Sequence, residues 1–544
     1  MFKFLNLKIM VFKNKKIDNT AIIFLTIAIM YAIGNFIWWT INTPVIPMWI
    51  SAVHFIDIFR EGNLFHNAPL LTWVMRLMFL TFGNGSYDLQ IIFVNYVFFL
   101  IPLYFVYKIG VELKDKETGN IAMILFALVP AVYGMSRQYG HQDYHIIAGI
   151  TFNIYCLIKT DYFRDRKWTI WYGISVGLGL MIKDAFLAYF FVPFIYIVIK
   201  GLKEKTDRAK VINVCMSIVL GSLIAGWHYF RPEIFMKVIQ EPIIEQQPVF
   251  SFESLRVMTI GLWEELLSPP IFILFVIGLV FFIFKYRGKY KNVVLLWFFV
   301  PWSVITFMPH YKVSEYGAGF IPAVILFASL FLTNIKSKYT KAVIITFLTG
   351  LLFFQYIDFS YAPYHTLLDI KLKYKNSFIM YYNKFYSIMF YDIRKSDFTL
   401  KLIKYLKNNY PNNSIYIEEY FISDPACLVA QMYLNNINFK NSEGILSSDI
   451  ILIMNKMKTT QDIVEFMIKK ILENPLNSKI ITRDFKDELS LKMKRIFKLV
   501  NQNYNIIKEF SLNELNNEDT KVTLLGRKDK FSEFNEKHAI LDVK

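Results

Sequence analysis

Four ionisable side chains stand beside long apolar segments of the chain, namely Arg137, Asp143, Lys183 and Lys312. Charge is costly in apolar surroundings, so ionisable groups at such positions are candidates for function. Lysine and arginine can hold an anionic group, and a carboxylate can draw a proton from a hydroxyl group. This set predicts a polar site at one face of an otherwise apolar protein.

Each of these candidates also has a purely structural interpretation. Arg137 and Asp143 could form a structural ion pair across a short loop. Lys183 could extend to the membrane surface and pair with its neighbour Asp184. Lys312, between aromatic residues, could simply anchor the chain at the interface.

A second candidate set lies in the long polar–apolar stretch 41–87. Its residues His54, Asp57 and Glu61 are spaced i, i+3 and i+7, so on a helix they share one face. That face could present a base, with His54 poised beside it or binding a metal. The alternative is the polar side of an amphipathic surface helix over 48–60, followed by a second amphipathic run over 71–82.

The spacing His141-x-Asp143-x-His145 is that of some metal sites. The three side chains would converge only in extended backbone, and His145 already enters an apolar segment. No cofactor is firmly implied, and a divalent metal stays an open option. Glu264 and Glu265 are interpreted as a helix end at the interface, with acid–base work as the alternative.

The composition predicts that these residues are positioned by membrane-spanning helices. Of the 544 residues, 55% are hydrophobic and only 19% are charged, which is too little charge for a soluble protein of this length. Apolar runs of about 18 or more residues recur, and each is long enough to cross a bilayer. About eleven spans are expected, at 20–40, 88–108, 119–135, 144–160, 168–183, 184–200, 210–230, 268–285, 292–309, 317–334 and 339–358.

The net charge of +17 is interpreted as a topology signal, with no nucleic-acid partner. The cations concentrate in alternate connections, at 108–118, 159–167, 200–210, 285–291 and 335–341. The positive-inside rule then predicts a multi-pass protein of the cytoplasmic (inner) membrane with a cytoplasmic N-terminus. The same cations could also bind acidic membrane lipids or an anionic lipid-linked substrate.

After residue 358 the composition changes, and charged residues and asparagine become frequent. Short β-type runs at 414–417, 449–453, 479–482 and 521–525 alternate with helical patterns at 398–408, 425–433 and 459–472. This alternation predicts an α/β domain over 359–544. With an odd number of spans, that domain would be extracytoplasmic, following a membrane domain over 1–358.

The order of motifs resembles a known family. It comprises the long first outer loop with Ala68-Pro69-Leu70, the Arg137 and Asp143 loop, the run from Gly173 through Gly177 to Lys183, and the late Lys312, Tyr316 and Pro322. Together they resemble the GT-C glycosyltransferases of the protein O-mannosyltransferase and aminoarabinose-transferase type (glycosyltransferase family 39), over about residues 20–335.

The resemblance implies an α-helical GT-C membrane fold and a glycosyltransferase of the inverting type. Its donor would be a polyprenyl-phosphate sugar, and its acceptor a lipid, glycan or protein at the outer face of the cytoplasmic membrane. Cations near the phosphodiester would help the leaving group depart. The resemblance implies substrate or phosphate binding by Arg137, Lys183 and Lys312, with Tyr316, His66 and Asn67 lining the site.

One departure from the family pattern concerns the base. The family usually opens its first surface helix with an acidic residue, which would fall near Pro47, and 42–47 contains no carboxylate. Asp143, Asp57 and His54 are therefore the catalytic candidates. The missing acid also keeps open a catalytically inactive GT-C-like subunit that binds lipid-linked glycan. A lipid-sugar transporter is a third hypothesis, although no inverted repeat is evident.

Overall fold

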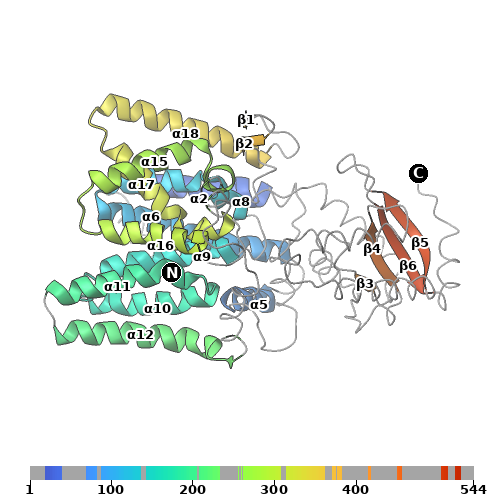
Figure 1. Ribbon diagram of the computed structural model, residues 1–544, viewed down its shortest axis with the longest axis horizontal. Coiled ribbons are helices and arrows are strands. Elements are labelled where there is room, and N and C mark those ends of the chain that lie inside the picture. The colour runs from blue at the N-terminus through green and yellow to red at the C-terminus, as the bar shows by residue number, and fades with distance from the viewer. Residues whose placement is uncertain are drawn as a thin grey trace, which may run out of the picture.

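A bundle of long helices dominates the computed structural model, and strands follow it late in the chain (Figure 1). The structure describes residues 19–38, 69–82, 87–136, 142–204, 207–232, 261–307 and 314–361, the six strands given below, and isolated positions at 234, 255 and 259. Statements about absence refer to these residues alone.

Where a short connection joins two long helices, as at residues 160–165, the two helices run antiparallel. The helical elements are α2 (Asn19–Met30), η1 (Tyr31–Trp38), α5 (Leu70–Phe82), α6 (Tyr87–Leu113), α7 (Lys116–Ala127), α8 (Pro130–Met135), α9 (Gln142–Lys159), α10 (Arg166–Ile182), α11 (Phe186–Glu204), α12 (Arg208–Tyr229), η2 (Leu262–Leu267), α15 (Pro269–Phe284), α16 (Lys291–Phe307), η3 (Ser314–Phe320), α17 (Ile321–Thr333) and α18 (Lys338–Tyr361).

Helix occurs in each of the eleven segments that the apolar runs predict, with three departures in form. The run 20–40 continues from α2 into the π-helix η1. The run 119–135 is not one helix, because Pro130 starts a new helix at its first position and ends the preceding one. The run 317–334 begins as a 3-10 turn before α17. Within the described chain, six helices are long and apolar enough to cross a membrane, and α15 and α16 are shorter apolar helices. The protein is thus a multi-pass helical membrane protein, and the count of eleven crossings stays a prediction.

Helix α17 forms the centre of the bundle. Almost every one of its side chains is buried, and aromatic residues of α15 and α16 pack against its Phe327. By contrast, large apolar side chains such as Leu25, Leu223, Phe284 and Phe347 are exposed on α2, α12, α15 and α18. An apolar surface of this kind suits hydrocarbon rather than water, which agrees with the bilayer as solvent.

The lysine-rich connections meet at one end of the bundle, which we call the basic end. In Figure 1 the α11–α12, α15–α16 and α17–α18 connections lie together on that side. Lys289 joins Asp161 at 2.5 Å, Lys159 joins Glu112 at 3.0 Å, and the Tyr286 hydroxyl donates to the Leu113 carbonyl at 2.6 Å. The predicted grouping of these connections on one side is therefore present in the fold.

The α9–α10 connection at the basic end holds three consecutive left-handed residues, Asp161, Tyr162 and Phe163, at φ 47°, 59° and 63°. Each such residue costs about 1–2 kcal/mol when it is not glycine. Tyr162 and Phe163 are buried, and the Asn213 amide donates to the Phe163 carbonyl at 2.8 Å. Tertiary packing therefore imposes this turn.

The opposite end of the bundle carries α5 and is called the α5 end. Trp73 of α5 stacks on Trp227 of α12, with ring centroids 4.9 Å apart and planes 9° from parallel. The Tyr229 hydroxyl donates to the Leu180 carbonyl at 2.6 Å and ties the end of α12 to the end of α10. The predicted run 71–82 of the first loop is thus a helix docked against the end of α12, whereas the run 48–60 lies outside the described residues.

Six strands follow the bundle. The strands β1 (Ile370–Tyr374) and β2 (Ser377–Tyr382) form an antiparallel pair. The strands β3 (Ile415–Ile417), β4 (Ile450–Asn455), β5 (Tyr504–Ser511) and β6 (Lys521–Arg527) form a sheet in the order β3-β4-β6-β5, parallel only between β3 and β4. Three of the four predicted β-type runs correspond to β3, β4 and β6. The run 479–482 and the three helical patterns lie outside the described residues, so the α/β domain over 359–544 stays a prediction.

Candidate active site

A buried ion pair lies at the α5 end, between the start of α9 and the end of α10. The Lys183 ammonium lies 2.6 and 2.7 Å from the two carboxylate oxygens of Asp143. Only 15% of the lysine side chain and 8% of the aspartate side chain are exposed. Both oxygens engage the same ammonium, so the contact is a charge-assisted hydrogen-bonded pair shielded from solvent.

Local backbone structure places both groups. Asp143 stands in the first turn of α9, where the helix dipole stabilises a carboxylate. Lys183 caps the C-terminus of α10 in extended conformation, at φ −161° and ψ 142°, with its N–H bonded to the Gly179 carbonyl. The extended residue directs the chain away from α10 into the tight turn before α11, and its side chain reaches Asp143 across the bundle.

Tyr316 completes the cluster from a third direction. The Lys183 ammonium lies 4.5 Å from the centroid of the Tyr316 ring, which is cation–π geometry. The Tyr189 hydroxyl of α11 donates to the Tyr316 carbonyl and holds η3 in place. Asp143 of α9 and Tyr316 of η3 therefore contact the Lys183 ammonium at the end of α10, and Tyr189 of α11 holds Tyr316 in place.

The backbone next to Tyr316 is closely packed at Gly319. A β-carbon at Gly319 would come within 2.5 Å of the Tyr189 ring, so only glycine allows this approach. The Trp297 indole N–H donates to the Gly319 carbonyl at 3.1 Å. Sequence reasoning missed Tyr189 and Trp297, since both lie in apolar runs. The Gly-Ala-Gly pattern at 317–319 was the available signal that a bulky side chain approaches the backbone there.

The glycines that precede Lys183 allow α10 to pack closely against α12. A β-carbon on Gly173 would lie 2.7 Å from the Ser217 carbonyl oxygen, and one on Gly177 would lie 2.5 Å from the Ile224 β-carbon. Small residues four apart let two membrane helices approach closely. The Gly-x-x-x-Gly pattern thus seats α10 on α12, and this contact fixes the position of Lys183 at the end of α10.

Two sequence-based interpretations are wrong. Lys183 does not pair with its neighbour, because the Asp184 carboxylate accepts the Ala185 N–H at 2.7 Å while Lys183 reaches Asp143. The metal interpretation of Asp143 with His145 also fails. Both residues are helical, so positions two apart point to different sides. The His145 Nε2 instead lies 3.0 Å from the Asn95 Oδ1.

His145 belongs to a buried polar network beside the ion pair. The Asn95 amide donates to the Ser136 carbonyl at 3.0 Å, and the Asn35 amide donates to the Ser136 hydroxyl at 2.6 Å. The Tyr144 hydroxyl donates to the Asn95 carbonyl at 3.0 Å. These bonds join η1, α6, α8 and α9, and so they brace the start of α9, where Asp143 stands.

Most of the other predicted site residues lie outside the part of the chain that the structure describes. His54, Asp57, His66, Asn67, Arg137 and Lys312 lie outside the described residues, as do Glu61 and His141. Glu264 and Glu265 lie on η2. Of the predicted set, the structure brings together Asp143, Lys183 and Tyr316. In the part of the chain that the structure describes, no group of three or more His, Cys, Asp or Glu residues could hold a metal ion.

Residues 66–227 match the family model described as dolichyl-phosphate-mannose-protein mannosyltransferase. The chain resembles the GT-C glycosyltransferases of this type. The matched segment runs from just before α5 to the end of α12, so it contains both Asp143 and Lys183. Tyr316 lies beyond it. No curated protein matches the chain.

The solved structures that match the chain include ArnT and AglB, at low identity and with TM-scores below 0.5. Apo ArnT from Cupriavidus metallidurans is 12% identical at a TM-score of 0.44, with 64% of this chain and 65% of that chain covered. ArnT bound to undecaprenyl phosphate is 11% identical at 0.47, with 77% and 76% covered. AglB from Archaeoglobus fulgidus, in complex with an inhibitory peptide and a dolichol-phosphate, is 12% identical at 0.41, with 88% and 60% covered. The chain thus spans just under two thirds of the apo ArnT chain.

Proposed function

We propose that the protein is an integral-membrane glycosyltransferase that takes a sugar from a polyprenyl-phosphate donor. The acceptor is a lipid, glycan or protein, and the reaction takes place at the α5 end, on the outer face of the cytoplasmic membrane. The observation that carries the proposal is the buried Asp143–Lys183 pair under Tyr316. The mannosyltransferase family match over 66–227 supports the same reaction class.

Lys183 is the phosphate-binding group in this proposal. Transfer breaks the bond between the anomeric carbon of the sugar and a phosphate oxygen, so negative charge grows on the leaving phosphate. An ammonium held in a water-poor site stabilises that charge strongly. The mostly buried Lys183, held by Asp143 and by the Tyr316 ring, is already oriented and needs little reorganisation.

Asp143 has a role that depends on the donor. While it is paired with Lys183, both of its oxygens accept hydrogen bonds from the ammonium, so neither is free to take a proton from an acceptor hydroxyl. A donor phosphate that takes over Lys183 removes this partner, and the freed carboxylate can then accept the proton of the acceptor hydroxyl. The base would thus become available only after the donor has bound. The face of His54 and Asp57 is the alternative source of a base.

The test is transfer of labelled sugar from a polyprenyl-phosphate sugar to acceptor in membranes that contain the protein. Lys183→Gln is expected to lower the rate by about 100-fold or more, the usual loss when a preorganised electrostatic group is removed. The matched control is Lys159→Gln, which removes a lysine from the Lys159–Glu112 pair at the basic end and should leave the rate within about twofold.

Other outcomes separate the alternative functions. Tight donor binding without transfer to any acceptor would favour the inactive GT-C-like subunit. Movement of the lipid-linked sugar across vesicle membranes without transfer would favour a transporter. Full activity of Lys183→Gln would contradict the assigned phosphate role while leaving the reaction class intact.

A further inference from the structure

A cavity of about 510 Å³ lies between α2, α6 and α7, away from the candidate active site. Its lining is almost wholly apolar or aromatic and comprises Thr20, Ala21, Phe24, Leu25, Tyr104, Tyr107 and Met123. The volume is in the range of cavities that hold small molecules. Leu25 and Tyr104 are exposed on the outside of the bundle, so the cavity opens toward the bilayer rather than toward the centre of the protein.

The cavity lies near the basic end. Thr20 is in the first turn of α2, and Met123 is two turns into α7. Tyr107 precedes the end of α6 at Leu113 by about 9 Å, at a rise of about 1.5 Å per residue. This depth corresponds to the boundary between head groups and acyl chains, at the opposite end of the bundle from Lys183.

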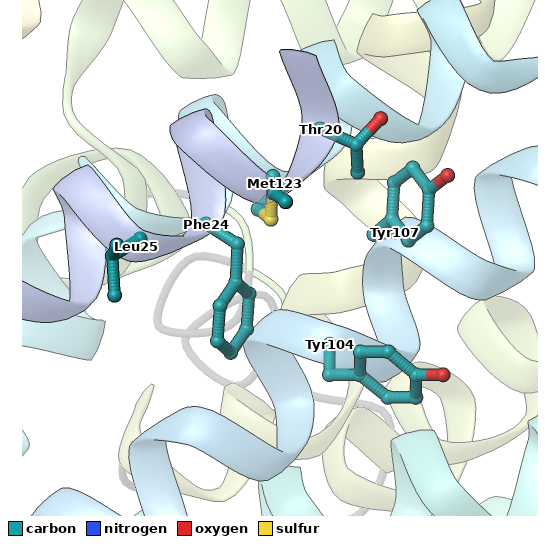
Figure 2. Close-up of a pocket in the computed structure, with 7 residues that line it drawn as sticks. Thr20, Phe24, Leu25, Tyr104, Tyr107 and Met123 are labelled. Atoms are coloured by element: carbon teal, nitrogen blue, oxygen red, sulfur yellow. The ribbon is translucent and has the colours of Figure 1, made fainter. Parts of the chain in front are cut away.

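The side chains that bear hydroxyl groups lie together on one side of the cavity. Figure 2 shows the hydroxyl groups of Thr20, Tyr104 and Tyr107 on one side of the cavity and the side chains of Phe24 and Leu25 on the other. Beside the hydroxyl-bearing side stands a cation, because the Lys108 ammonium lies 5.7 Å from the Tyr104 ring centroid. An apolar lining with a cation close to it suits an apolar chain joined to an anionic head.

The packing around α2 keeps the cavity formed. The Tyr96 hydroxyl of α6 donates to the Ala28 carbonyl of α2 at 2.9 Å and joins the two helices one turn beyond the cavity. Nearer the basic end, Phe24 meets Tyr104 edge to face at 6.4 Å between centroids. The helices therefore touch on the far side of the cavity, and the space near the start of α2 remains between them.

We infer that this cavity binds one chain of an anionic phospholipid, with the lipid phosphate at Lys108. Membrane-facing clusters of lysine attract anionic lipids, and the basic end carries such a cluster. The bound lipid is distinct from the donor of the proposed transfer reaction, whose phosphate belongs at Lys183 at the opposite end. Binding can be measured without any activity assay, so it stands or falls separately from the proposed function.

The test is native mass spectrometry of the full-length protein in detergent, titrated with dioleoyl phosphatidylglycerol or dioleoyl phosphatidylcholine. The wild-type protein is expected to retain the anionic lipid about fivefold better, the preference that one lysine near the head group provides. Lys108→Gln should abolish the preference. The matched control is Lys200→Gln, which removes a lysine that also lies over tyrosine rings, those of Tyr162 and Tyr196, neither of which lines this cavity. It should keep the preference.

A cavity-filling variant tests the site itself. Met123→Trp should abolish retention of both lipids, and Ala21→Phe fills the same space from α2 if the first variant does not fold. Equal retention of the two lipids by the wild-type protein would overturn the head-group assignment. Retention of phosphatidylglycerol by both filled variants would show that the lipid does not bind in this cavity. Stronger retention of a polyprenyl phosphate than of phosphatidylglycerol would show that the assigned lipid is the wrong one.

Discussion

Ion pairs at the two ends of the bundle differ in how far water reaches them. At the basic end, the side chains of Lys289 and Asp161 are 48% and 41% exposed, and those of Lys159 and Glu112 are 32% and 31% exposed. At the α5 end, Lys183 and Asp143 are 15% and 8% exposed. Exposed ion pairs contribute little to stability. Burial of two charges costs desolvation free energy, and two well-packed apolar side chains in the same place would not carry that cost.

The charges at the two ends differ in whether their exact position matters. The cations of the basic end serve their purpose wherever they stand in the loops, because the positive-inside rule counts charges and not contacts. Lys183 has one fixed position, set by the close approach of α10 to α12 and by the Tyr316 ring. Burial of this pair is not needed for stability, and under the proposed function the pair serves to bind the donor phosphate.

The largest expected effect concerns removal of one member of the buried pair. Asp143→Asn leaves the Lys183 ammonium buried without its counter-charge and should lower the free energy of unfolding by about 3 kcal/mol. Glu112→Gln at the basic end should cost less than about 1 kcal/mol. Both are measured by thermal unfolding in detergent.

The Asp143→Asn/Lys183→Gln double variant sharpens this comparison. It should recover part of the loss, because the uncompensated charge is gone. Equal costs for Asp143→Asn and Glu112→Gln would show that the two ends do not differ.

A smaller effect is expected at the α10–α12 contact. Gly177→Val inserts a side chain where even a β-carbon would lie 2.5 Å from Ile224, and overpacking of this kind costs about 1–3 kcal/mol. Gly350→Ala is the matched control, since a β-carbon there meets nothing within 4 Å. Thermal unfolding of both variants tests the claim, and it fails if they unfold alike.

The Tyr316 ring should have an effect of about 1 kcal/mol on donor binding. Tyr316→Leu removes the cation–π contact with Lys183 and should raise the KM for the donor by about three- to tenfold. Tyr316→Phe keeps the ring and should leave the KM near the wild-type value. A similar rise in both variants would point to the hydroxyl group instead of the ring.

The smallest effect belongs to the basic end. The hydrogen bond from Lys289 lowers the pKa of the Asp161 carboxyl, with help from the charges of Lys289 and Arg164. A depressed carboxyl pKa stabilises the fold above the unfolded pKa of about 4, and the contribution disappears as the pH falls through the lower folded pKa. Asp161→Asn should therefore cost less than about 1 kcal/mol at pH 7.

The pH dependence is the check on that variant. The difference in melting temperature between the wild-type protein and Asp161→Asn should stay constant from pH 8 to about pH 5 and then shrink toward pH 3. A difference that grows on acidification would contradict the assigned ionisation.

Much of the helical architecture follows from the sequence because apolar runs and breakers act locally. The turn after Lys183 and the grouping of the lysine-rich connections are of this kind. The pairing of Lys183 with Asp143 could not be predicted in this way. Asp143 lies forty positions away, and only the antiparallel packing of α9 and α10 brings the two side chains together. The strand β5 was missed because Asn505, Lys508 and Glu509 dilute its apolar pattern. Local composition cannot reveal that a neighbouring strand, β6, supplies the pairing.

The stacked indoles of Trp73 and Trp227 give the protein an optical signature of its own. Two parallel rings 4.9 Å apart couple their electronic transitions, so the pair should yield a paired positive and negative band in circular dichroism that neither ring gives alone. One ring belongs to the first-loop helix α5 and the other to the end of α12. The band therefore reports, without any added label, whether α5 stays docked on α12.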